Sequence, residues 1–490
     1  MVGPMKLAIV GGGPSSFYVA SRLLSLLPHG STHSSYLKIH IYDRLWAPHG
    51  LVRYGVAPDH PEVKNCVHKF DQAALDARLR FFGNVHIGTE SSTVIPHALH
   101  LPLSSLQQNY THLLFSSGCG VPILHPALPP SPHVLPALSL VHWYTQHPSQ
   151  PTPPPLDKVT HVTLIGQGNV SLDVARMLLT DPSVLQQYDV PEPVLAVLRR
   201  STVQHVSIVG RRGPLEAAFT TKELREMMNL GHASMVPLDP AVLAQAAAPG
   251  TALSRQQSRT LQLLQKGSVN KPGSTAKTWS LDFFRSPTGL AASTSTPTPS
   301  SQLTLALAHT ALDADARAVP TGATSAQPTD LVITSLGHRA DPAAPFYDAR
   351  TGHLRTRAGR ITDGAGRAVR GVYASGWAAM GARGVLASTM MDAYGVADTM
   401  LSDHFIETPE AAAPKPPLEY AEEDMMAREV DLESVPEEVE RGVREGRVVQ
   451  YEQWKAVDAE EVKRGEARHK ERERMGWEEA HAFLTSAKAQ

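Results

Sequence analysis

KLAIVGGGPSS, residues 6–16, decides the fold of this chain. A short apolar run that stops at three glycines and leads into a helical pattern predicts a strand, a tight turn and a helix. Gly11 permits the turn, and Gly13 lets the backbone approach a pyrophosphate at the N-terminus of the helix. The strand predicted at 37–43 ends in Asp43, a carboxylate suited to a ribose hydroxyl. A single glycine turn of this kind can equally serve only to pack a strand against a helix. Whether it indicates a dinucleotide site therefore depends on the rest of the chain.

A second turn of the same kind, GQGNVS at 166–171, follows the apolar run at 161–165. The next predicted strand, at 205–209, is followed by Arg211 and Arg212 where an NAD site would place a carboxylate. Two guanidiniums at this position are typical of a site for the 2′-phosphate of NADP. We therefore predict FAD at the first turn and NADPH at the second, with hydride passing between the two rings.

The other predicted strands are short runs of Val, Ile and Leu at 112–115, 331–336 and 371–374. Helical patterns lie between several of them. Strands that alternate with helices predict a parallel α/β sheet wound on both faces. Apolar residues make up 42% of the 490-residue chain, a length that suits two or three domains.

Two stretches interrupt this pattern. Prolines are frequent between 121 and 155, which favours an extended connection between domains. Residues 286–301 contain 12 Ser, Thr or Pro out of 16, a composition that predicts a mobile surface insert.

Charge is unevenly divided along the chain. The formal net charge is −2, which argues against a nucleic-acid-binding protein. Residues 411–490 contain 13 Lys and Arg against 20 Asp and Glu, a net charge of −7, so the remaining body carries +5. We expect residues 411–450 to be loosely held.

Several chemistries find no support in the sequence. Cys66 and Cys119 form no CxxC pair, the 23 histidines show no HExxH spacing, and no GxSxG motif occurs. These absences argue against disulfide reductase, metal-site and hydrolase chemistry. Two cysteines cannot make a disulfide framework, which indicates a reducing compartment. The chain also lacks the run of about 20 apolar residues that a membrane-spanning helix needs.

Longer strings carry a family resemblance. They are GGGPSSFYVA at 11–20, GLVRYGVAPDHPEVKN at 50–65, GQGNVSLDVAR at 166–176, VGRRGPLEAAFTTKELREM at 209–227, FFRSP at 283–287 and YEQWKAVDAEEVKRG at 451–465. In sequence and order they resemble the adrenodoxin reductase family, the mitochondrial-type NADPH:ferredoxin oxidoreductases that contain FAD. The resemblance implies a glutathione-reductase-like fold of two Rossmann-like domains, with the NADP domain inserted in a discontinuous FAD domain.

The implied division of the chain has four parts. They are a first half of the FAD domain at 1–120, an NADP domain at 121–335 with a linker at 121–157, a second FAD half at 336–408, and a charged extension at 409–490 packing on or near the FAD domain.

The resemblance also assigns residues to the two cofactors. For FAD they are Gly11, Gly13, Ser15, Asp43, Leu51, Ile87, Trp377, Gly384, Val385 and Leu386. For NADP they are Gln167, Gly168, Asn169, Val170, Arg211, Arg212, Glu223 and Gly384. The stretch AAMGAR at 378–383 departs from the Lys-Arg-Gly-Pro-Thr-like run common in the family, and Arg383 offers a displaced positive charge.

His60 and Glu226 match a pair that the family brings together near the flavin. We expect them to modulate electron transfer or proton balance. The alternative interpretation is that His60, flanked by Pro58 and Pro61, makes a hydrogen bond within its loop.

The electron acceptor implied by the resemblance is an acidic 2Fe-2S ferredoxin, or adrenodoxin. Arg255 and Arg259, four residues apart on an apparent helix, are similar to the docking arginines of the family; a solvated helical face is the alternative. The family implies a monomer on the matrix side of the mitochondrial inner membrane, serving P450, haem or iron–sulfur pathways. No presequence is visible before the first strand, so we expect a processed or trimmed start.

The predicted function is therefore electron transfer from NADPH through FAD, one electron at a time, to a 2Fe-2S ferredoxin. Two alternatives are weighed against it. One is another flavoprotein with two dinucleotide sites, such as a flavin monooxygenase. The other is a non-enzymatic Rossmann scaffold, which would bind no flavin.

Overall fold

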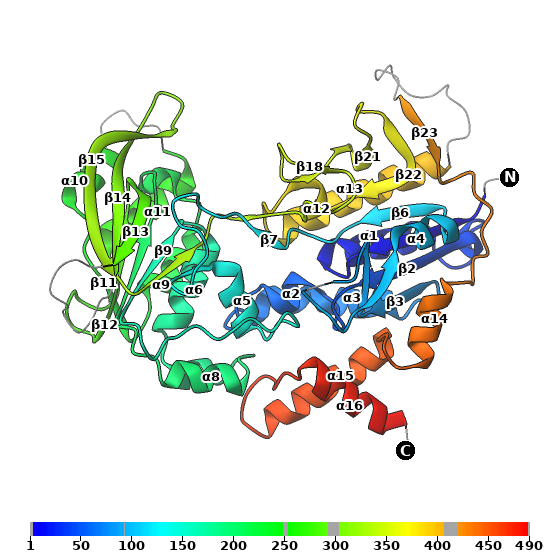
Figure 1. The fold of residues 1–490 in the computed structure, drawn as a ribbon, viewed down its shortest axis with the longest axis horizontal. Coiled ribbons are helices and arrows are strands. Elements are labelled where there is room, and N and C mark those ends of the chain that lie inside the picture. Colours follow the sequence, from blue (N-terminus) through cyan, green and yellow to red (C-terminus); the bar gives the residue numbers. More distant parts are fainter. Residues whose placement is uncertain (1–2, 93, 248–252, 293–302, 406–418, 489–490) are drawn as a thin grey trace.

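The two glycine turns of the sequence lie in two separate lobes of the computed structural model (Figure 1). The structure describes residues 3–92, 94–247, 253–292, 303–405 and 419–488.

The first lobe is built on an eight-stranded sheet with the order β20-β21-β22-β6-β1-β2-β3, and β23 beside β22. The strands β22, β6, β1, β2 and β3 run parallel, so their carboxyl ends meet at one edge. The strands are β1 Met5–Val10, β2 Leu37–Asp43, β3 Leu79–Gly83, β6 His112–Phe115, β20 Thr356–Arg357, β21 Arg360–Thr362, β22 Ala368–Ala374 and β23 Tyr420–Asp424.

Helices α1 Pro14–Leu26, α3 Val67–Ala74 and α13 Leu386–His404 pack together over this sheet. Their apolar faces fill the core, where the rings of Phe17 and Phe70 stack at 5.2 Å. Smaller elements complete the lobe. They are η1 Ser34–Tyr36, α2 Leu51–Tyr54, η2 Pro61–Cys66, β4 Val85–Gly88, β5 Leu99–Pro102, α4 Leu103–Asn109, β18 Tyr347–Asp348, β19 His353–Leu354 and α12 Trp377–Met380.

The second lobe contains a six-stranded parallel sheet with the order β11-β12-β10-β9-β16-β8. Its strands are β8 Val134–Pro136, β9 His161–Ile165, β10 His205–Val209, β11 Ala233–Met235, β12 Lys277–Asp282 and β16 Leu331–Thr334. Its helices are α5 Ala137–Tyr144, α6 Asn169–Leu179, α7 Pro182–Leu185, α8 Glu192–Arg199, η3 Pro214–Glu216, α9 Thr221–Met228, α10 Pro240–Ala246 and α11 Arg255–Lys266. Because residues on both sides of this lobe in the sequence build the first sheet, the predicted inserted arrangement is confirmed.

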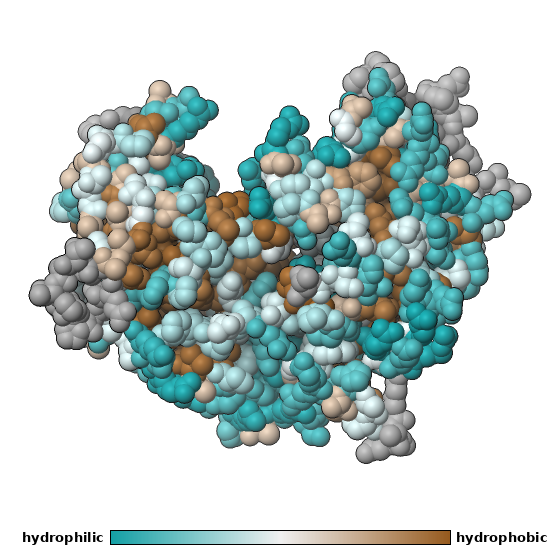
Figure 2. All heavy atoms as spheres, in the orientation of Figure 1, coloured by the Kyte–Doolittle hydropathy of each residue, from teal (hydrophilic) through white to brown (hydrophobic). Residues whose placement is uncertain are grey.

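The two lobes are joined by a narrow ribbon near the middle of the molecule (Figure 1). β7 Val121–Pro122 leaves the first lobe and β17 His338–Arg339 returns to it, and the two pair antiparallel. Figure 2 shows a notch in the molecular surface between the lobes, with hydrophobic residues along its floor.

The predicted mobile insert at 286–301 is wrong for its first part. Residues up to Ala292 belong to β13 Arg285–Ala292, which pairs with β14 Leu303–Leu312, and β15 Ala318–Thr329 completes a three-stranded antiparallel sheet. β13 is an edge strand with a bulge between Pro287 and Gly289, a place where a sheet tolerates proline. Residues 293–302 lie outside the described part of the chain. The proline-rich linker likewise holds β8 and helix α5, so it is extended only in part.

The expectation that residues 411–450 are loosely held is also wrong where the structure describes them, from 419 onward. β23 extends the first sheet, and α14 Glu437–Arg444 packs against β5. A few apolar anchors, Met425, Val439 and Val448, are buried within a mostly charged sequence. The chain ends with α15 Tyr451–Glu466 and α16 Trp477–Lys488, below the first lobe in Figure 1. Among the helices described, none has the length and apolar character needed to cross a membrane.

Candidate functional site

The first glycine turn connects β1 to α1. It packs tightly against the protein at Gly11 and is open at Gly13. Gly11 has φ +108°, and a Cβ there would lie 2.6 Å from the carbonyl oxygen of Ser116, so only glycine fits. A Cβ on Gly13 would meet no atom within 4 Å, so the backbone before α1 faces open space. A helix N-terminus beneath open space is suited to hold a pyrophosphate.

Asp43 ends β2 directly beside this turn and is buried. One carboxylate oxygen accepts a hydrogen bond from the Gly12 N–H at 2.9 Å, and the other accepts one from the Leu45 N–H at 3.0 Å. Burial raises the pKa of Asp43 to about 6. The carboxylate thus holds the turn in shape, a role that the sequence did not indicate.

Three more residues of the predicted FAD set lie in or near α1, the first turn and β2. The Ser15 hydroxyl lies 2.6 Å from that of Ser375, which donates to Asp392 at 2.9 Å, so α1 is tied to β22 and α13. Leu51 follows Gly50, where a Cβ would lie 3.1 Å from Gly13 Cα. Ile87 lies half-buried on β4, beside the strand that ends in Asp43.

The turn before α13 leaves apolar groups uncovered. Gly384 has φ +83°, and the side chain of Val385 is 59% exposed although it is apolar. The Trp377 Nε1–H donates to the carbonyl of Arg383 at 3.0 Å, which fixes the indole beside this turn. In the AAMGAR stretch Ala378 and Ala379 are buried, while Met380 and Arg383 face solvent. An exposed apolar strip of this kind fits the ring of a flavin.

The second turn repeats the geometry of the first. Gly166 has φ +123°, and a Cβ there would lie 2.2 Å from the carbonyl oxygen of Ser335. A Cβ on Gly168 would meet nothing within 4 Å, so this turn also opens before a helix, α6. The Asn169 side chain accepts from the Thr220 N–H at 2.8 Å, and Gln167 donates to the Ile208 carbonyl at 3.2 Å. The half-buried Val170 lies in the first turn of α6.

Arg211 and Arg212 follow β10 and are exposed. Within the described residues, neither guanidinium has a carboxylate within 4 Å. Arg255 and Arg259 are exposed on α11, whose Gln257 donates to the carbonyl of Leu215 in η3. The basic residues of the two segments therefore lie on neighbouring elements.

His60 and Glu226 are brought together across the two lobes. The His60 Nε2 lies 2.7 Å from a carboxylate oxygen of Glu226. Burial lowers the pKa of His60 and the bond to Glu226 raises it, with a net rise. For Glu226 burial raises the pKa and the bond to His60 lowers it, with a net fall. The two shifts favour an imidazolium–carboxylate pair.

Arg176 on α6 binds the carboxylates around this pair, and sequence reasoning missed it. Its guanidinium contacts Asp59 at 2.5 Å, Asp173 at 2.8 Å, Glu223 at 3.2 Å and Glu226 at 3.4 Å. Burial raises the pKa of Glu223 to about 7. His60, Glu223 and Glu226 have ligand atoms within 4.8 Å of one another, as a metal site would, but the guanidinium already supplies positive charge there.

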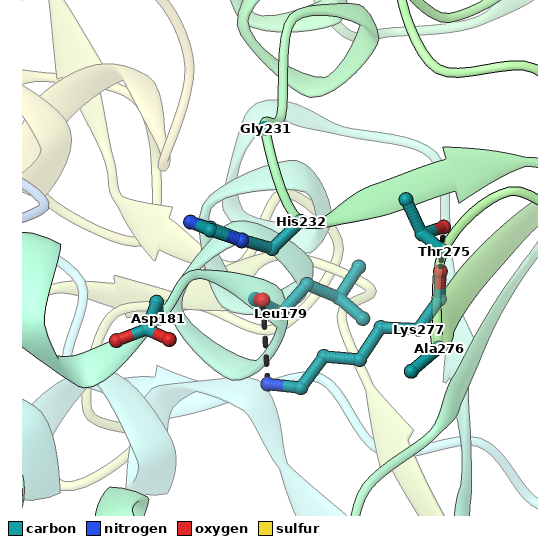
Figure 3. A pocket seen from close by; sticks show the side chains of 7 residues that line it. All are labelled: Leu179, Asp181, Gly231, His232, Thr275, Ala276 and Lys277. Carbon is teal, nitrogen blue, oxygen red and sulfur yellow. Dashed lines mark hydrogen bonds between the residues drawn. The ribbon is translucent and has the colours of Figure 1, made fainter.

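A pocket of about 280 Å³ lies elsewhere in the second lobe (Figure 3). It is lined by Leu179, Asp181, Gly231, His232, Thr275, Ala276 and Lys277. Lys277 begins β12 and donates to the carbonyl of Leu179, which ends α6. The pocket is therefore at the amino edge of the sheet, opposite the glycine turn, and is not the dinucleotide site.

Comparison with known proteins decides the family. No family model matches the chain. NADPH:adrenodoxin oxidoreductase, mitochondrial, of Homo sapiens is 37% identical over 96% of this chain and 90% of its own length. The Bos taurus enzyme of the same name is 35% identical with the same coverage. This chain belongs to the NADPH:adrenodoxin oxidoreductase family.

A solved structure of another relative supports the fold of this family member. FprA of Mycobacterium tuberculosis superposes with a TM-score of 0.82 at 29% sequence identity, and covers 98% of this chain and 100% of its own. A second structure, described as FprA in complex with NADPH, has a TM-score of 0.80. By sequence, the NADPH-ferredoxin reductase FprA is 33% identical over 82% of the chain.

Proposed function

We propose that this chain is an FAD-dependent NADPH:ferredoxin oxidoreductase that passes electrons one at a time to a 2Fe-2S ferredoxin. One observation carries the proposal: two open glycine turns, each before a helix, lie on the two lobes, and the second is followed by two exposed arginines. FAD, when bound, accepts the hydride at N5 and releases its electrons singly. The task of this chain is to orient the two cofactors and to tune their surroundings.

The first turn is proposed to hold FAD. Gly13 and the N-terminus of α1, which starts at Pro14, face the diphosphate, and Asp43 accepts from a ribose hydroxyl with its remaining lone pairs. Leu51 and Ile87 line the pocket from the first half of the lobe. Trp377 and the turn Gly384–Val385–Leu386 cover the ring from the second half.

The second turn is proposed to hold NADPH. Gln167, Gly168, Asn169 and Val170 present backbone groups to the diphosphate, and Arg211 and Arg212 bind the 2′-phosphate. Glu223 and Gly384 line the nicotinamide end. Because Gly384 belongs to the first lobe, the nicotinamide would meet the flavin where the lobes face each other.

His60 and Glu226 are proposed to control proton balance beside the flavin. Their bond joins the lobes, and Arg176 holds Glu226 from the other side at 3.4 Å. A charged imidazole near the reacting rings would favour a negative charge that develops there.

The exposed arginines of α11, Arg255 and Arg259, are proposed to dock the acidic ferredoxin. The body of the chain carries the positive net charge, and such a field speeds the encounter with an acidic partner. We further propose a monomer that works at the matrix side of the mitochondrial inner membrane. The animal relatives are named mitochondrial, which supports this location. P450, haem or iron–sulfur pathways would consume the electrons.

Stopped-flow spectroscopy tests the function. The purified protein should absorb as an oxidised flavoprotein, bleach with NADPH much faster than with NADH, and recover when mixed with an oxidised 2Fe-2S ferredoxin. A colourless protein that gains no activity with added FAD would favour the binding scaffold. Rapid oxidation of NADPH by oxygen in the presence of an organic substrate would favour a monooxygenase.

A further inference from the structure

The covalent connection between the two lobes is slender. It consists of β7 and β17, two residues each, whose pairing is extended by the bond from the Ile123 N–H to the Gly337 carbonyl at 3.0 Å. A two-stranded ribbon taken alone is only marginally stable. Contacts outside the ribbon are therefore needed to keep the lobes in one orientation, and the His60–Glu226 bond is one of them.

The C-terminal segment 449–475 is anchored in the first lobe. Val449 forms a β-bridge with Gly83 at the end of β3. In α15, Glu461 is fully buried and accepts two bonds from the guanidinium of Arg53, at 3.0 and 2.7 Å. Trp454 lies against the other side of this guanidinium, 4.6 Å from the ring centre. Arg53 belongs to α2, the helix that begins with the proposed flavin contact Leu51.

The same segment then crosses to the second lobe. The guanidinium of Arg474 pairs with Asp189, which lies between α7 and α8, and also donates to the carbonyl of Thr145. Arg474 and Asp189 are only 1% and 3% exposed. Lys64 of the first lobe donates to the same carboxylate at 3.2 Å. In Figure 1 the loop between α15 and α16 extends from beneath the first lobe toward α8.

Further bonds fix this crossing. Lys470, also buried, donates to the carbonyl of Val190, and Glu473 accepts from the Glu192 N–H at 3.0 Å. The Glu473 N–H donates back to the Glu461 carbonyl at 2.9 Å, and the Met475 N–H donates to the Glu461 carboxylate at 2.9 Å. The contact to the second lobe and the contact to Arg53 are therefore parts of one hydrogen-bonded unit.

We propose that residues 449–475 form an interdomain brace that holds the NADP-binding lobe in the orientation required for hydride transfer, with Arg474 and Asp189 as its positioning residues. The ribbon β7–β17 acts as a hinge at the centre of the molecule, and the brace closes the other side. Neither positioning residue belongs to the sets proposed to hold FAD or NADPH. They act through the distance and angle between the two rings, on which hydride transfer depends steeply.

Substitution Arg474→Met tests the brace, since it keeps the bulk of the side chain and removes its charge. The limiting rate of flavin reduction at saturating NADPH should fall at least tenfold, while the dissociation constant of NADPH changes less than threefold. The matched control is Arg464→Met, which removes an arginine of the same segment whose ion pairs, among the described residues, are with Glu460 and Glu479 of the tail. Its rate should equal that of the wild type.

A second readout does not depend on activity. Spin labels on Leu75→Cys in the first lobe and Val269→Cys in the second, positions 86% and 60% exposed, report the interdomain distance by pulsed electron paramagnetic resonance. Cys66 and Cys119 are first replaced by Ser. Arg474→Met should broaden the distance distribution and Arg464→Met should not. An unchanged distribution together with an unchanged limiting rate would overturn the brace.

Should Arg474→Met fail to fold with its flavin, Lys470→Met replaces it, because it removes the bond from the brace to the Val190 carbonyl and leaves the Arg474–Asp189 pair in place. A limiting rate within 1.5-fold of the wild type in that variant would overturn the proposal. The inference rests on the proposed hydride transfer. Failure of the wild type to reduce its flavin with NADPH would contradict that function, whereas equal rates in wild type and variants would contradict the brace alone.

Discussion

We expect Arg211 and Arg212 to set the preference of the second turn for NADPH over NADH, since both are exposed directly after β10. Each charge-assisted bond to a 2′-phosphate contributes about 1.5–3 kcal/mol, which corresponds to roughly a 10- to 100-fold effect. The double substitution Arg211→Gln with Arg212→Gln should lower kcat/KM for NADPH by about 100-fold or more and leave kcat/KM for NADH nearly unchanged. Arg199→Gln in the same lobe is the control. Equal losses with both cofactors would contradict the assignment.

The His60–Glu226 pair predicts a pH dependence of flavin reduction. Burial lowers and Glu226 raises the pKa of His60, and its net value lies above the ordinary 6.5. A histidine with a raised pKa is fully charged below 6.5 and loses its charge as the pH rises through the raised value. The limiting rate of flavin reduction should therefore change above pH 6.5 in the wild type. In His60→Gln the limiting rate of flavin reduction should differ from that of the wild type and should not change with pH above 6.5. A wild-type rate and profile in that variant would contradict the role.

Residues with local steric roles were predictable from the sequence itself, whereas the one distant pair that was expected, His60 with Glu226, came from the family resemblance. Gly11 and Gly166 were found because a strand, a turn and a helix are contiguous and their steric needs are local. The contact of Arg176 with Asp59 joins residues 117 positions apart across two lobes, which no periodicity reveals. The only signal was that each lies inside a string shared with the family, APDHPE and LDVAR.

At the scale of elements, α11 offers a test of ferredoxin docking. Arg255 and Arg259 are one turn apart on its exposed face. Reversing both charges, Arg255→Glu with Arg259→Glu, should raise the KM for ferredoxin about tenfold at low salt and leave flavin reduction by NADPH intact. The difference should shrink as salt screens the charges. Arg200→Glu with Arg317→Glu, at the end of α8 and in the β14–β15 hairpin, is the matched double reversal, and an equal effect there would show that net charge alone matters.

Amino-acid composition gave wrong predictions for two segments, because it does not show how a segment pairs within a sheet or packs on its neighbours. The stretch around Pro287 looked unable to fold because it is rich in Ser, Thr and Pro, yet an edge strand needs only half of its backbone groups paired. The tail beyond residue 419 looked like a solvated acidic appendage. In the structure its charges pair with each other and with both lobes, for example Glu461 with Arg53. The central strands of both main sheets followed from their apolar runs, because burial on two faces leaves a clear signal. Strands nearer the edges, β3, β8, β11 and β12, were not predicted.

At the scale of the whole molecule, the ion pairs of the C-terminal tail make the free energy of unfolding depend on pH in the acidic range. Burial raises the pKa of Asp189, but the charges of Arg474 and Lys64 lower it by more. The net pKa of Asp189 therefore lies well below the ordinary 3.8. Burial raises and Arg472 lowers the pKa of Asp458, which falls to about 2. A carboxylate with a lowered pKa stabilises the fold above 3.8, and this contribution is lost as the pH falls through the folded-state value.

Asp189→Asn should therefore lower the free energy of unfolding by about 3 kcal/mol at pH 7, because it leaves buried cations without their carboxylate. The difference in unfolding free energy between the variant and the wild type should shrink as the pH falls from 4 to about 2. Over this range Asp189 of the wild type binds a proton in the unfolded chain but not in the folded one. Denaturant unfolding followed by tryptophan fluorescence measures both effects, since Trp454 packs in the brace. Asp315→Asn, on an exposed turn, should change stability by less than about 0.5 kcal/mol at any pH. A difference that stayed constant down to pH 2 would mean that the variant perturbs packing, and that the charge of Asp189 does not hold the two lobes together.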